Sequence, residues 1–241
     1  MDFFSRAIAS LLILTLSPLF LSIALFSFLI QGRPILFKQK RVGKDFQPFN
    51  IYKFRTLKKN NKINNLFANT VRFKTSKWGG FLRRTKLDEI PQLFNIVIGE
   101  MRFIGPRPEI PEYVVEEKFD FLRNLKPGLS GYSSIIFRNE LEIMSLIENE
   151  NPYNDILKIK IALDRYYKIK KGFIEDFKLI IITLLSLIMP EKTGHYLLMK
   201  LLDIDKSKLD LKSIIKDVKF KSKEKTLFRL NRKYFNPNFK R

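Results

Sequence analysis

The chain has 241 residues, enough for one well-packed core with appendages. Its 45 Lys and Arg against 24 Asp and Glu give a net charge of +21, which indicates an anionic partner: nucleic acid, a phosphorylated ligand or an anionic membrane face. The chain has no Cys and a single His, His195, which excludes a disulfide framework, thiol chemistry and a zinc site built on His and Cys.

The N-terminal segment has no charged residue between positions 7 and 30, and as one straight helix it would be long enough to cross a bilayer. The run is interrupted by Ser17-Pro18, where the proline removes a backbone hydrogen bond and kinks the helix. A kinked span would leave the N-terminus outside and the Lys/Arg-rich remainder in the cytoplasm. A re-entrant hairpin would instead leave Arg6 and Arg33 on the same side. Composition alone favours the span, because proline kinks are common in membrane helices.

Two short strands are predicted next, over residues 35–37 and 49–54, around a turn at residues 43–45. Alternation in the second strand puts Lys53 and Arg55 on one face. These two cations are either simply solvated or clamp a phosphate. The polar stretch 57–74 that follows has no clear period and is predicted to be a loop.

The central motif is TKLDEIPQLFN, residues 85–95, in which apolar residues recur at helical spacing. Proline is tolerated only in the first turn of a helix, so Pro91 predicts a helix that begins near Leu87 or Asp88, with Asp88 at or beside the N-cap. Asp88 is then either an ordinary capping residue or a reactive carboxylate. Asp88 and Glu89 would repel each other unless a cation such as Mg²⁺ neutralised one of them.

Two stiff turns follow the central motif. Prolines flank Arg107 in IGPRPE (104–109), and a guanidinium held in this way suits bidentate phosphate binding, although the segment could also be an ordinary Pro-rich turn. The second turn, KPGLSG (126–131), leads to Arg138.

The C-terminal part is predicted to be helical over residues 153–171 and 174–189. The apolar run LIIITLLSLIM within the second helix is too short to span a bilayer, so this helix is either buried or interfacial. The basic tail from residue 200 to 241 is expected to bind a surface, either the protein's own domain or anionic lipid.

Taken together, these stretches resemble the bacterial sugar transferases, also called monotopic phosphoglycosyl transferases. The resemblance covers residues 2 to 190. It rests on seven pieces in family order: the Ser17-Pro18 break, FKQKRVG (37–43), YKFRT (52–56), GGFLRR (79–84), LDEIPQLFN (87–95), IGPRPE (104–109) and KPGLSG (126–131).

The resemblance implies an α+β fold. It implies a re-entrant membrane helix broken at Ser17-Pro18, in place of the span that composition favours, over residues 1–32. A small mixed catalytic domain with short strands and amphipathic interfacial helices is expected over residues 33–190, followed by a basic extension over residues 191–241. The family resemblance also implies the bacterial inner membrane, with the catalytic domain on the cytoplasmic face.

The resemblance implies transfer of a phosphosugar from a UDP-sugar to undecaprenyl phosphate, releasing UMP and requiring Mg²⁺. Asp88 would be the nucleophile that forms a covalent phosphosugar intermediate, and Glu89 would hold the metal with it. The cations expected to bind the substrate phosphates are Lys53, Arg55, Arg83, Arg107 and Arg138. Membrane lipid is an expected partner, nucleic acid is not, and a homo-oligomer is left open.

The chain departs from the family pattern at a few positions. Lys86 and Arg102 replace residues that are commonly Ser, and residues 132–140 are nearer a subset that ends in Phe-Arg-Asn-Glu. The sugar and the glycan pathway are therefore not assigned. A membrane-associated nucleic-acid-binding or scaffold protein without catalysis is the alternative, since it would also explain the charge.

Overall fold

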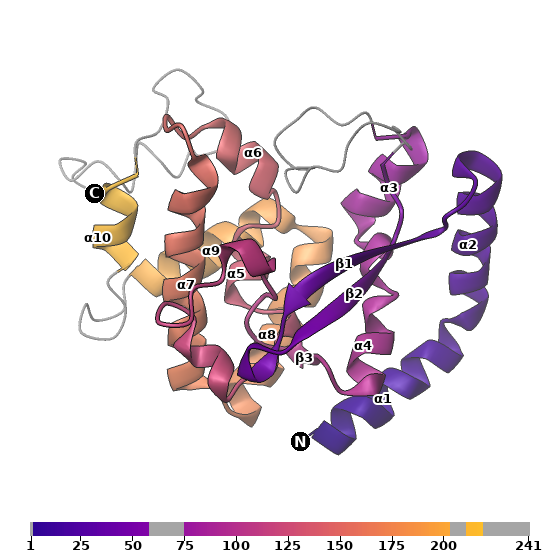
Figure 1. Ribbon diagram of the computed structural model, residues 1–241, viewed down its shortest axis with the longest axis horizontal. Helices are drawn as coiled ribbons and strands as arrows, with labels where there is room; N and C mark the ends of the chain where they lie inside the picture. The colour runs from indigo at the N-terminus through magenta and orange to yellow at the C-terminus, as the bar shows by residue number, and fades with distance from the viewer. Residues whose placement is uncertain (1, 58–74, 203–210, 219–241) are drawn as a thin grey trace. The chain divides into compact units, whose positions relative to one another are not determined.

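The computed structural model describes residues 2–57, 75–202 and 211–218 (Figure 1). It combines helices with short strands, which confirms the predicted α+β class. The chain divides into two compact units, Met1–Phe103 with Pro108–Leu129, and Ile104–Arg107 with Ser130–Arg241. The sequence predicts boundaries near residues 32 and 190, between a membrane segment, a catalytic domain and a basic extension. These boundaries stay a prediction, because the two compact units do not separate those functions. Residues 58–74 of the predicted loop, and 203–210 and 219–241 of the tail, lie outside the described residues.

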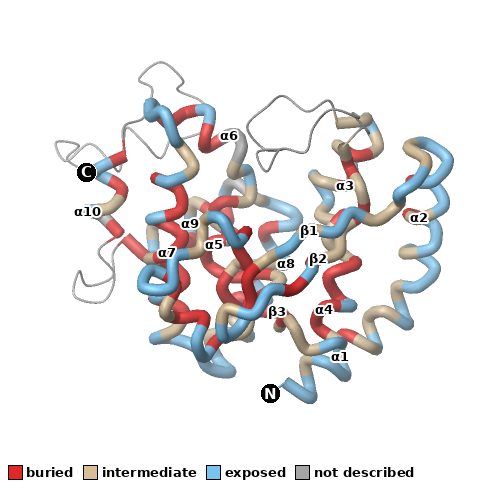
Figure 2. The backbone as a smooth tube through the Cα atoms, in the orientation of Figure 1, coloured by how far each residue is buried: buried red, intermediate tan, exposed pale blue. Residues whose placement is uncertain are grey.

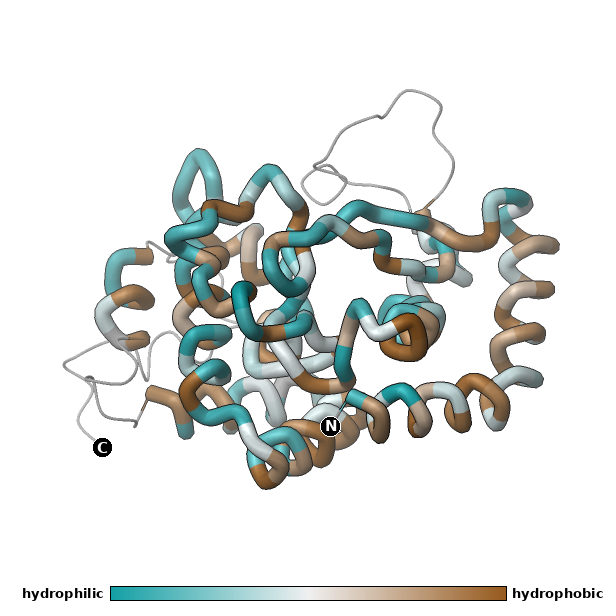
Figure 3. The backbone as a smooth tube through the Cα atoms, turned by 60° about the horizontal axis from the view of Figure 1, so that its bottom comes forward, coloured by the Kyte–Doolittle hydropathy of each residue, from teal (hydrophilic) through white to brown (hydrophobic). Residues whose placement is uncertain are grey.

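The N-terminal apolar run forms two helices, α1 (Asp2–Thr15) and α2 (Ser17–Gln31), which are bent by 62° at the break between them. Pro18 has no N–H to offer the carbonyl of Leu14, and the Ser17 hydroxyl donates to that carbonyl instead, at 2.8 Å. Among the described helices none is alone long and apolar enough to cross a membrane, whereas this bent pair qualifies by length and composition. Much of the pair is exposed (Figure 2) and apolar (Figure 3).

The core of the first unit is built around an antiparallel hairpin of β1 (Leu36–Val42) and β2 (Pro48–Phe54). Both predicted strands are confirmed, and the first extends to Val42. One apolar cluster joins α1 and β2 to α4 (Gln92–Ile98), and the other joins α2 and β2 to α3 (Lys77–Thr85). Ile90, immediately after the Asp88-Glu89 pair, packs against both clusters.

Short elements complete the first unit. Strand β3 (Arg102–Ile104) pairs with β4 (Gly128–Ser130) in a second two-stranded sheet. The single-turn 3₁₀ helices are η1 (Lys44–Phe46), η2 (Leu87–Glu89), η3 (Pro111–Tyr113) and η4 (Asp120–Arg123).

The described part of the second unit is mostly helical. Its longest helices, α7 (Pro152–Lys170) and α8 (Phe173–Ile188), confirm the two predicted there. The helix α10 (Leu211–Lys216) packs on α7 and buries Leu211 and Ile215, so this part of the tail contacts the protein's own domain. The remaining described helices are α5 (Tyr132–Ile136), α6 (Glu140–Ser145) and α9 (Pro190–Leu202).

Helix α3 lies against the end of β2 because Gly79 has no side chain. A Cβ at Gly79 would lie 2.1 Å from the carbonyl oxygen of Thr56, whereas a Cβ at the next residue, Gly80, would find nothing closer than Thr75 Oγ1 at 4.0 Å. The glycine pair in the GGFLRR motif therefore has two different roles, and only the first glycine is required for close packing.

We expect Gly79→Ala to lower the free energy of unfolding by about 1–3 kcal/mol, because the backbone must move to admit the methyl group. Gly80→Ala is the matched control and should be neutral or stabilising by up to about 1 kcal/mol, since alanine favours the helix. Denaturant unfolding in detergent micelles, followed by circular dichroism, measures both. Equal effects of the two substitutions would contradict this account of Gly79.

Candidate active site

The Asp88-Glu89 pair lies in the 3₁₀ turn η2, between α3 and α4. The sequence predicted a helix that begins near Leu87 or Asp88. The α-helix begins instead at Gln92, directly after Pro91. Pro91 has no N–H for the Leu87 carbonyl, which accepts the closer Ile90 N–H at 3.3 Å, as a 3₁₀ turn requires.

The prediction that Asp88 caps this helix is wrong, because α4 begins after Pro91. The N-cap of the turn is Lys86, in the left-handed conformation with φ of 61°, and Asp88 lies within the turn. Its carboxylate is only 6% exposed, and Oδ1 is buried without a hydrogen-bond partner in the described part of the chain. Asp88 thus does not act as an ordinary cap.

Glu89 lies in a cluster of cations. Its Oε1 accepts a hydrogen bond from Lys53 Nζ at 2.7 Å and lies 3.7 Å from Lys86 Nζ. Strand β2 supplies Lys53, and the left-handed residue between α3 and η2 supplies Lys86. The structure therefore brings Lys53, Asp88 and Glu89 together, as predicted. Lys86 also belongs to this cluster of charged side chains, whereas sequence analysis noted it only as a departure from the family pattern.

Burial raises the pKa of Asp88 above the ordinary value of 3.8, and the neighbouring Glu89 carboxylate raises it further. The positive charges of Lys53, Lys86 and Arg83 act in the opposite direction but do not reverse the shift. Arg83 lies in the last turn of α3, and its charge acts on Asp88. Its expected phosphate contact stays a prediction.

Asn95 fixes the helix after the pair to the strand that carries Lys53. Its side chain is fully buried, donates to the Asn50 carbonyl at 2.7 Å and accepts the Tyr52 N–H at 3.3 Å. It also donates to Glu100 Oε2 at 2.7 Å. Sequence analysis assigned no role to Asn95, although an amide on an otherwise apolar helix face is a signal that the side chain has a specific partner.

Arg55 lies just after β2, and its side chain is directed at the end of α2. Nη2 donates to the carbonyl of Gln31 and to that of Gly32, the latter at 3.0 Å. The expected phosphate contact of Arg55 stays a prediction, and its observed partners are main-chain carbonyls.

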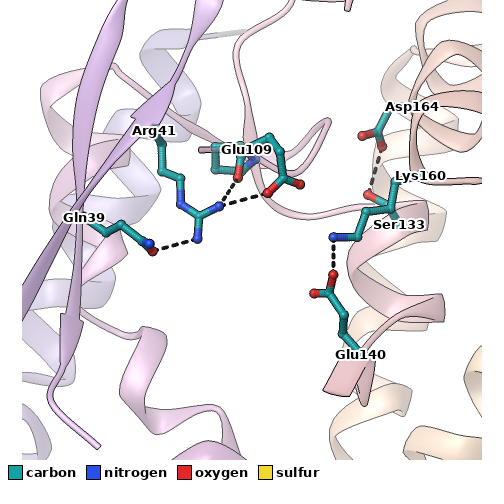
Figure 4. Close-up of polar contacts among 8 residues, drawn as sticks. Gln39, Arg41, Glu109, Ser133, Glu140, Lys160 and Asp164 are labelled. Carbon is teal, nitrogen blue, oxygen red and sulfur yellow. Dashed lines mark hydrogen bonds and ion pairs between the residues drawn. The ribbon is translucent and has the colours of Figure 1, made fainter. Parts of the chain in front are cut away.

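Arg107 and Arg138 belong to the second unit, and their expected phosphate contacts stay predictions. Residues beside both are well anchored, each within its own unit (Figure 4). In the first unit Arg41 pairs with the buried carboxylate of Glu109 at 3.2 Å, which holds the end of the IGPRPE motif on β1. In the second, Glu140, two residues after Arg138, binds Lys160 at 2.5 Å.

The family model described as bacterial sugar transferase matches residues 1–190. The chain belongs to this family. The match confirms the resemblance derived from the seven motifs and includes the bent helix pair, the Asp88-Glu89 turn and both Pro-containing turns.

Named relatives of this sugar transferase agree with the assignment. The chain is 32% identical over 182 residues to a UDP-glucose:undecaprenyl-phosphate glucose-1-phosphate transferase of Klebsiella pneumoniae, and the match covers 69% of this chain and 38% of that protein. The chain is 31% identical over 170 residues to an uncharacterized sugar transferase of Bacillus subtilis, and the match covers 68% of this chain and 76% of that protein. It is 33% identical over 157 residues to a UDP-N-acetylgalactosamine-undecaprenyl-phosphate N-acetylgalactosaminephosphotransferase of Aeromonas hydrophila, covering 63% and 34%. The matched region thus spans little more than a third of the two relatives named for a reaction.

The raised pKa of Asp88 has a consequence for stability. The folded state favours the protonated carboxyl, so the contribution of Asp88 to stability is present below pH 3.8 and is lost as the pH rises through the folded-state pKa. We expect Asp88→Asn to raise the free energy of unfolding at neutral pH, with a gain that shrinks as the pH falls towards 3.8.

Glu89→Gln is the matched control, and it should lower the free energy of unfolding where Asp88→Asn raises it. It removes the charge that accepts the Lys53 hydrogen bond at 2.7 Å, so we expect a loss of about 1–3 kcal/mol at neutral pH. Denaturant unfolding of both variants at several pH values tests the pair. A destabilised Asp88→Asn protein at neutral pH would contradict the account of Asp88.

Proposed function

We propose that this sugar transferase transfers a phosphosugar from a UDP-sugar to undecaprenyl phosphate, giving undecaprenyl-diphosphate-sugar and UMP, through a covalent intermediate on Asp88. The observation that carries the proposal is the buried Asp88 carboxylate, with one oxygen lacking a hydrogen bond, beside a cluster of cations. Desolvation and the absence of a hydrogen bond leave a carboxylate oxygen reactive, and the cations attract the substrate phosphates.

In the first step the Asp88 carboxylate attacks the phosphorus that bears the sugar. A bond forms between the carboxylate oxygen and this phosphorus, the bond from the phosphorus to the bridging oxygen of the diphosphate breaks, and UMP leaves with the electron pair. Asp88 attacks as the carboxylate, so no proton needs to be removed. Its raised pKa predicts that the acidic limb of the rate profile lies above the ordinary Asp value.

In the second step a phosphate oxygen of undecaprenyl phosphate attacks the same phosphorus and displaces the Asp88 carboxylate. The product is the lipid diphosphate-sugar, and the enzyme regains its ionised nucleophile. Dividing the reaction in this way replaces one transfer between a soluble donor and a lipid acceptor by two displacements at one residue.

Lys53, Lys86 and Arg83 would neutralise charge that develops on the transferred and leaving phosphates. Lys53 has three donors on its amino group and holds Glu89 with one of them at 2.7 Å. We expect the loss of one such cation to slow the reaction by about 10²–10³-fold.

The two adjacent carboxylates of Asp88 and Glu89 are oxygen donors of the kind that Mg²⁺ prefers. Within the described residues no group of three or more His, Cys, Asp or Glu could hold a metal alone, but Mg²⁺ is commonly held by one or two carboxylates together with substrate phosphates. The unpartnered Oδ1 of Asp88 and the adjacent Glu89 are the residues that would hold it. The ion would supply charge neutralisation at the diphosphate.

We further propose that the bent helix pair is a re-entrant hairpin in the bacterial inner membrane, with the site on the cytoplasmic face. Both ends of the helix pair contact the rest of the first unit. Asp2 pairs with Lys126 at 2.9 Å and Arg6 donates to the Val97 carbonyl at 2.7 Å, while the end of α2 is bound by Arg55. The ends of a spanning segment would be separated by the hydrocarbon core of about 30 Å, on opposite sides of the bilayer.

Helix α8 would contribute a second membrane contact. Leu179 and Ile182 are buried on one side of this helix, whereas a set of large apolar residues is exposed on the other. This is the pattern of a helix that lies in the interface plane rather than across the bilayer. The exposed set is Phe173, Ile174, Phe177, Ile180, Ile181, Leu184, Leu185, Leu187 and Ile188.

The alternative of a basic nucleic-acid-binding or scaffold protein has no support from the relatives, whose names describe sugar transfer. The positive charge is explained by phosphate substrates and an anionic membrane face.

The covalent step is tested with Asp88→Asn and Glu89→Gln. Each variant is incubated with Mg²⁺ and a panel of UDP-sugars that includes UDP-glucose and UDP-N-acetylgalactosamine, without lipid acceptor, and the labelled peptide is mapped by mass spectrometry. Asp88→Asn should form no adduct, because it keeps the shape but lacks the attacking charge. Glu89→Gln should form the adduct about 10²–10³-fold more slowly. An adduct on Glu89, or one still formed by Asp88→Asn, would overturn the assignment.

The hairpin is tested with single cysteines, since the chain has none of its own. Phe3 and Lys40 are both exposed, one before the helix pair and one after it. In intact cells Phe3→Cys and Lys40→Cys should both be shielded from an impermeant reagent, and both should react after permeabilisation. Labelling of Phe3→Cys alone in intact cells would establish a span, and Lys40→Cys controls for membrane integrity.

A further inference from the structure

Arg55 and Gln31 bind each other's backbone across 24 positions of sequence. Arg55 Nη2 donates to the carbonyls of Gln31 and Gly32, and Gln31 Nε2 donates in return to the Arg55 carbonyl at 3.0 Å. The last carbonyls of a helix lack intrahelical partners and carry the negative end of its dipole, so a guanidinium is well suited to bind them. A lysine ammonium has no planar fork with which to reach two adjacent carbonyls in the same way.

This contact attaches the end of α2 to the strand that supplies the site. Arg55 is two residues after Lys53 and directly follows β2, and Lys53 binds Glu89 at 2.7 Å. The end of α2 is therefore linked to the Asp88-Glu89 pair by the Arg55 guanidinium, the last two residues of β2 and the ion pair between Lys53 and Glu89. A displacement of the α2 end would be transmitted directly to the cation that holds Glu89.

We propose that Arg55 is a positioning residue that ties the exit of the re-entrant helix pair to strand β2 and so sets the depth of the active site relative to the membrane interface. This proposal rests on the proposed function and replaces the phosphate-binding role expected for Arg55. Its two bonds to main-chain carbonyls are made by Nη2, so this side chain is held at the end of α2.

The proposal predicts unequal effects on the two half-reactions. The UDP-sugar is water-soluble and reaches Asp88 from the aqueous phase at any depth of the site. The phosphate of undecaprenyl phosphate is confined to the interface, so its attack on the Asp88 adduct requires the site at the right level. A misplaced site should therefore affect the acceptor step more strongly than the donor step.

The kinetic test compares Arg55→Gln, Arg55→Lys and Gln31→Ala with wild type in vesicles that contain undecaprenyl phosphate. The donor is whichever UDP-sugar gives UMP release with wild-type enzyme. Consumption of the preformed adduct by the lipid should slow by about 10- to 100-fold in Arg55→Gln, the range expected from a lost charged hydrogen bond. Adduct formation and the KM for the UDP-sugar should change much less. Arg55→Lys and Gln31→Ala should show the same asymmetry with smaller losses.

Arg33→Gln is the matched control, because Arg33 is an exposed arginine at the same end of α2 whose guanidinium lies over the Phe28 ring at 6.0 Å. It removes the same charge without removing the link to β2, and it should leave the ratio of the two half-reactions unchanged. A large rise in the KM for the UDP-sugar, or equal loss of both half-reactions in Arg55→Gln, would overturn the proposal in favour of phosphate binding.

A spectroscopic readout tests the attachment without any activity. Trp78 is the only tryptophan of the chain, and its Nε1 donates to the buried hydroxyl of Ser27 in α2 at 2.9 Å. Its emission therefore reports the contact of α2 with α3. Arg55→Gln should shift this emission towards that of Ser27→Ala, whereas Arg33→Gln should not. Emission of Arg55→Gln identical to wild type would overturn the proposal.

The two proposals fail in distinguishable ways. If wild-type enzyme releases no UMP from any UDP-sugar, the proposed function is wrong, while the Trp78 measurement still reports whether Arg55 holds α2. If wild type is active and only the asymmetry is missing, the positioning role of Arg55 alone is wrong.

Discussion

The buried carboxylate of Asp88 is the constraint around which the first unit is arranged. A carboxylate removed from water, with one oxygen lacking a hydrogen bond and a second carboxylate beside it, is unfavourable unless cations surround it. Those cations cannot come from one segment. β2 supplies Lys53, α3 supplies Arg83 and the left-handed turn after α3 supplies Lys86. Packing that brings these three elements to η2 is therefore a condition for the site.

One glycine, Gly79, and one amide, that of Asn95, make that packing specific. Gly79 lets α3 approach the backbone at Thr56, and Asn95 binds α4 to the free edge of β2 at Asn50 and Tyr52. The first contact leaves no room for a side chain and the second satisfies a fully buried amide, so each holds its helix at a definite position. Ile90 packs in both apolar clusters and holds the turn between them.

The bent helix pair is attached to the rest of this unit at both ends. Asp2 and Arg6 hold α1 to Lys126 and to the end of α4, and Arg55 holds the end of α2 to β2. The bend between the helices is stabilised locally, since the Ser17 hydroxyl bonds the carbonyl that Pro18 leaves without a partner. The proposed reaction, which joins a soluble donor to a membrane lipid, would need a site at a defined depth, and a bent pair attached at its two ends would provide one.

The sequence by itself determined the features that depend on neighbouring residues. Apolar spacing and proline positions gave the two hairpin strands, α7, α8 and the break at Ser17-Pro18, because local backbone preferences follow from local side chains. The motifs in family order identified the sugar transferase family and the Asp88-Glu89 pair. The tertiary structure alone decided where the polar side chains find their partners. Alternation along β2 paired Arg55 with Lys53, yet Arg55 binds α2 carbonyls 23 and 24 positions away, and Asn95 binds a strand more than 40 positions away. The physical reason is that a buried polar group must be satisfied by whichever desolvated donor or acceptor the fold brings near, and sequence spacing does not encode that neighbour.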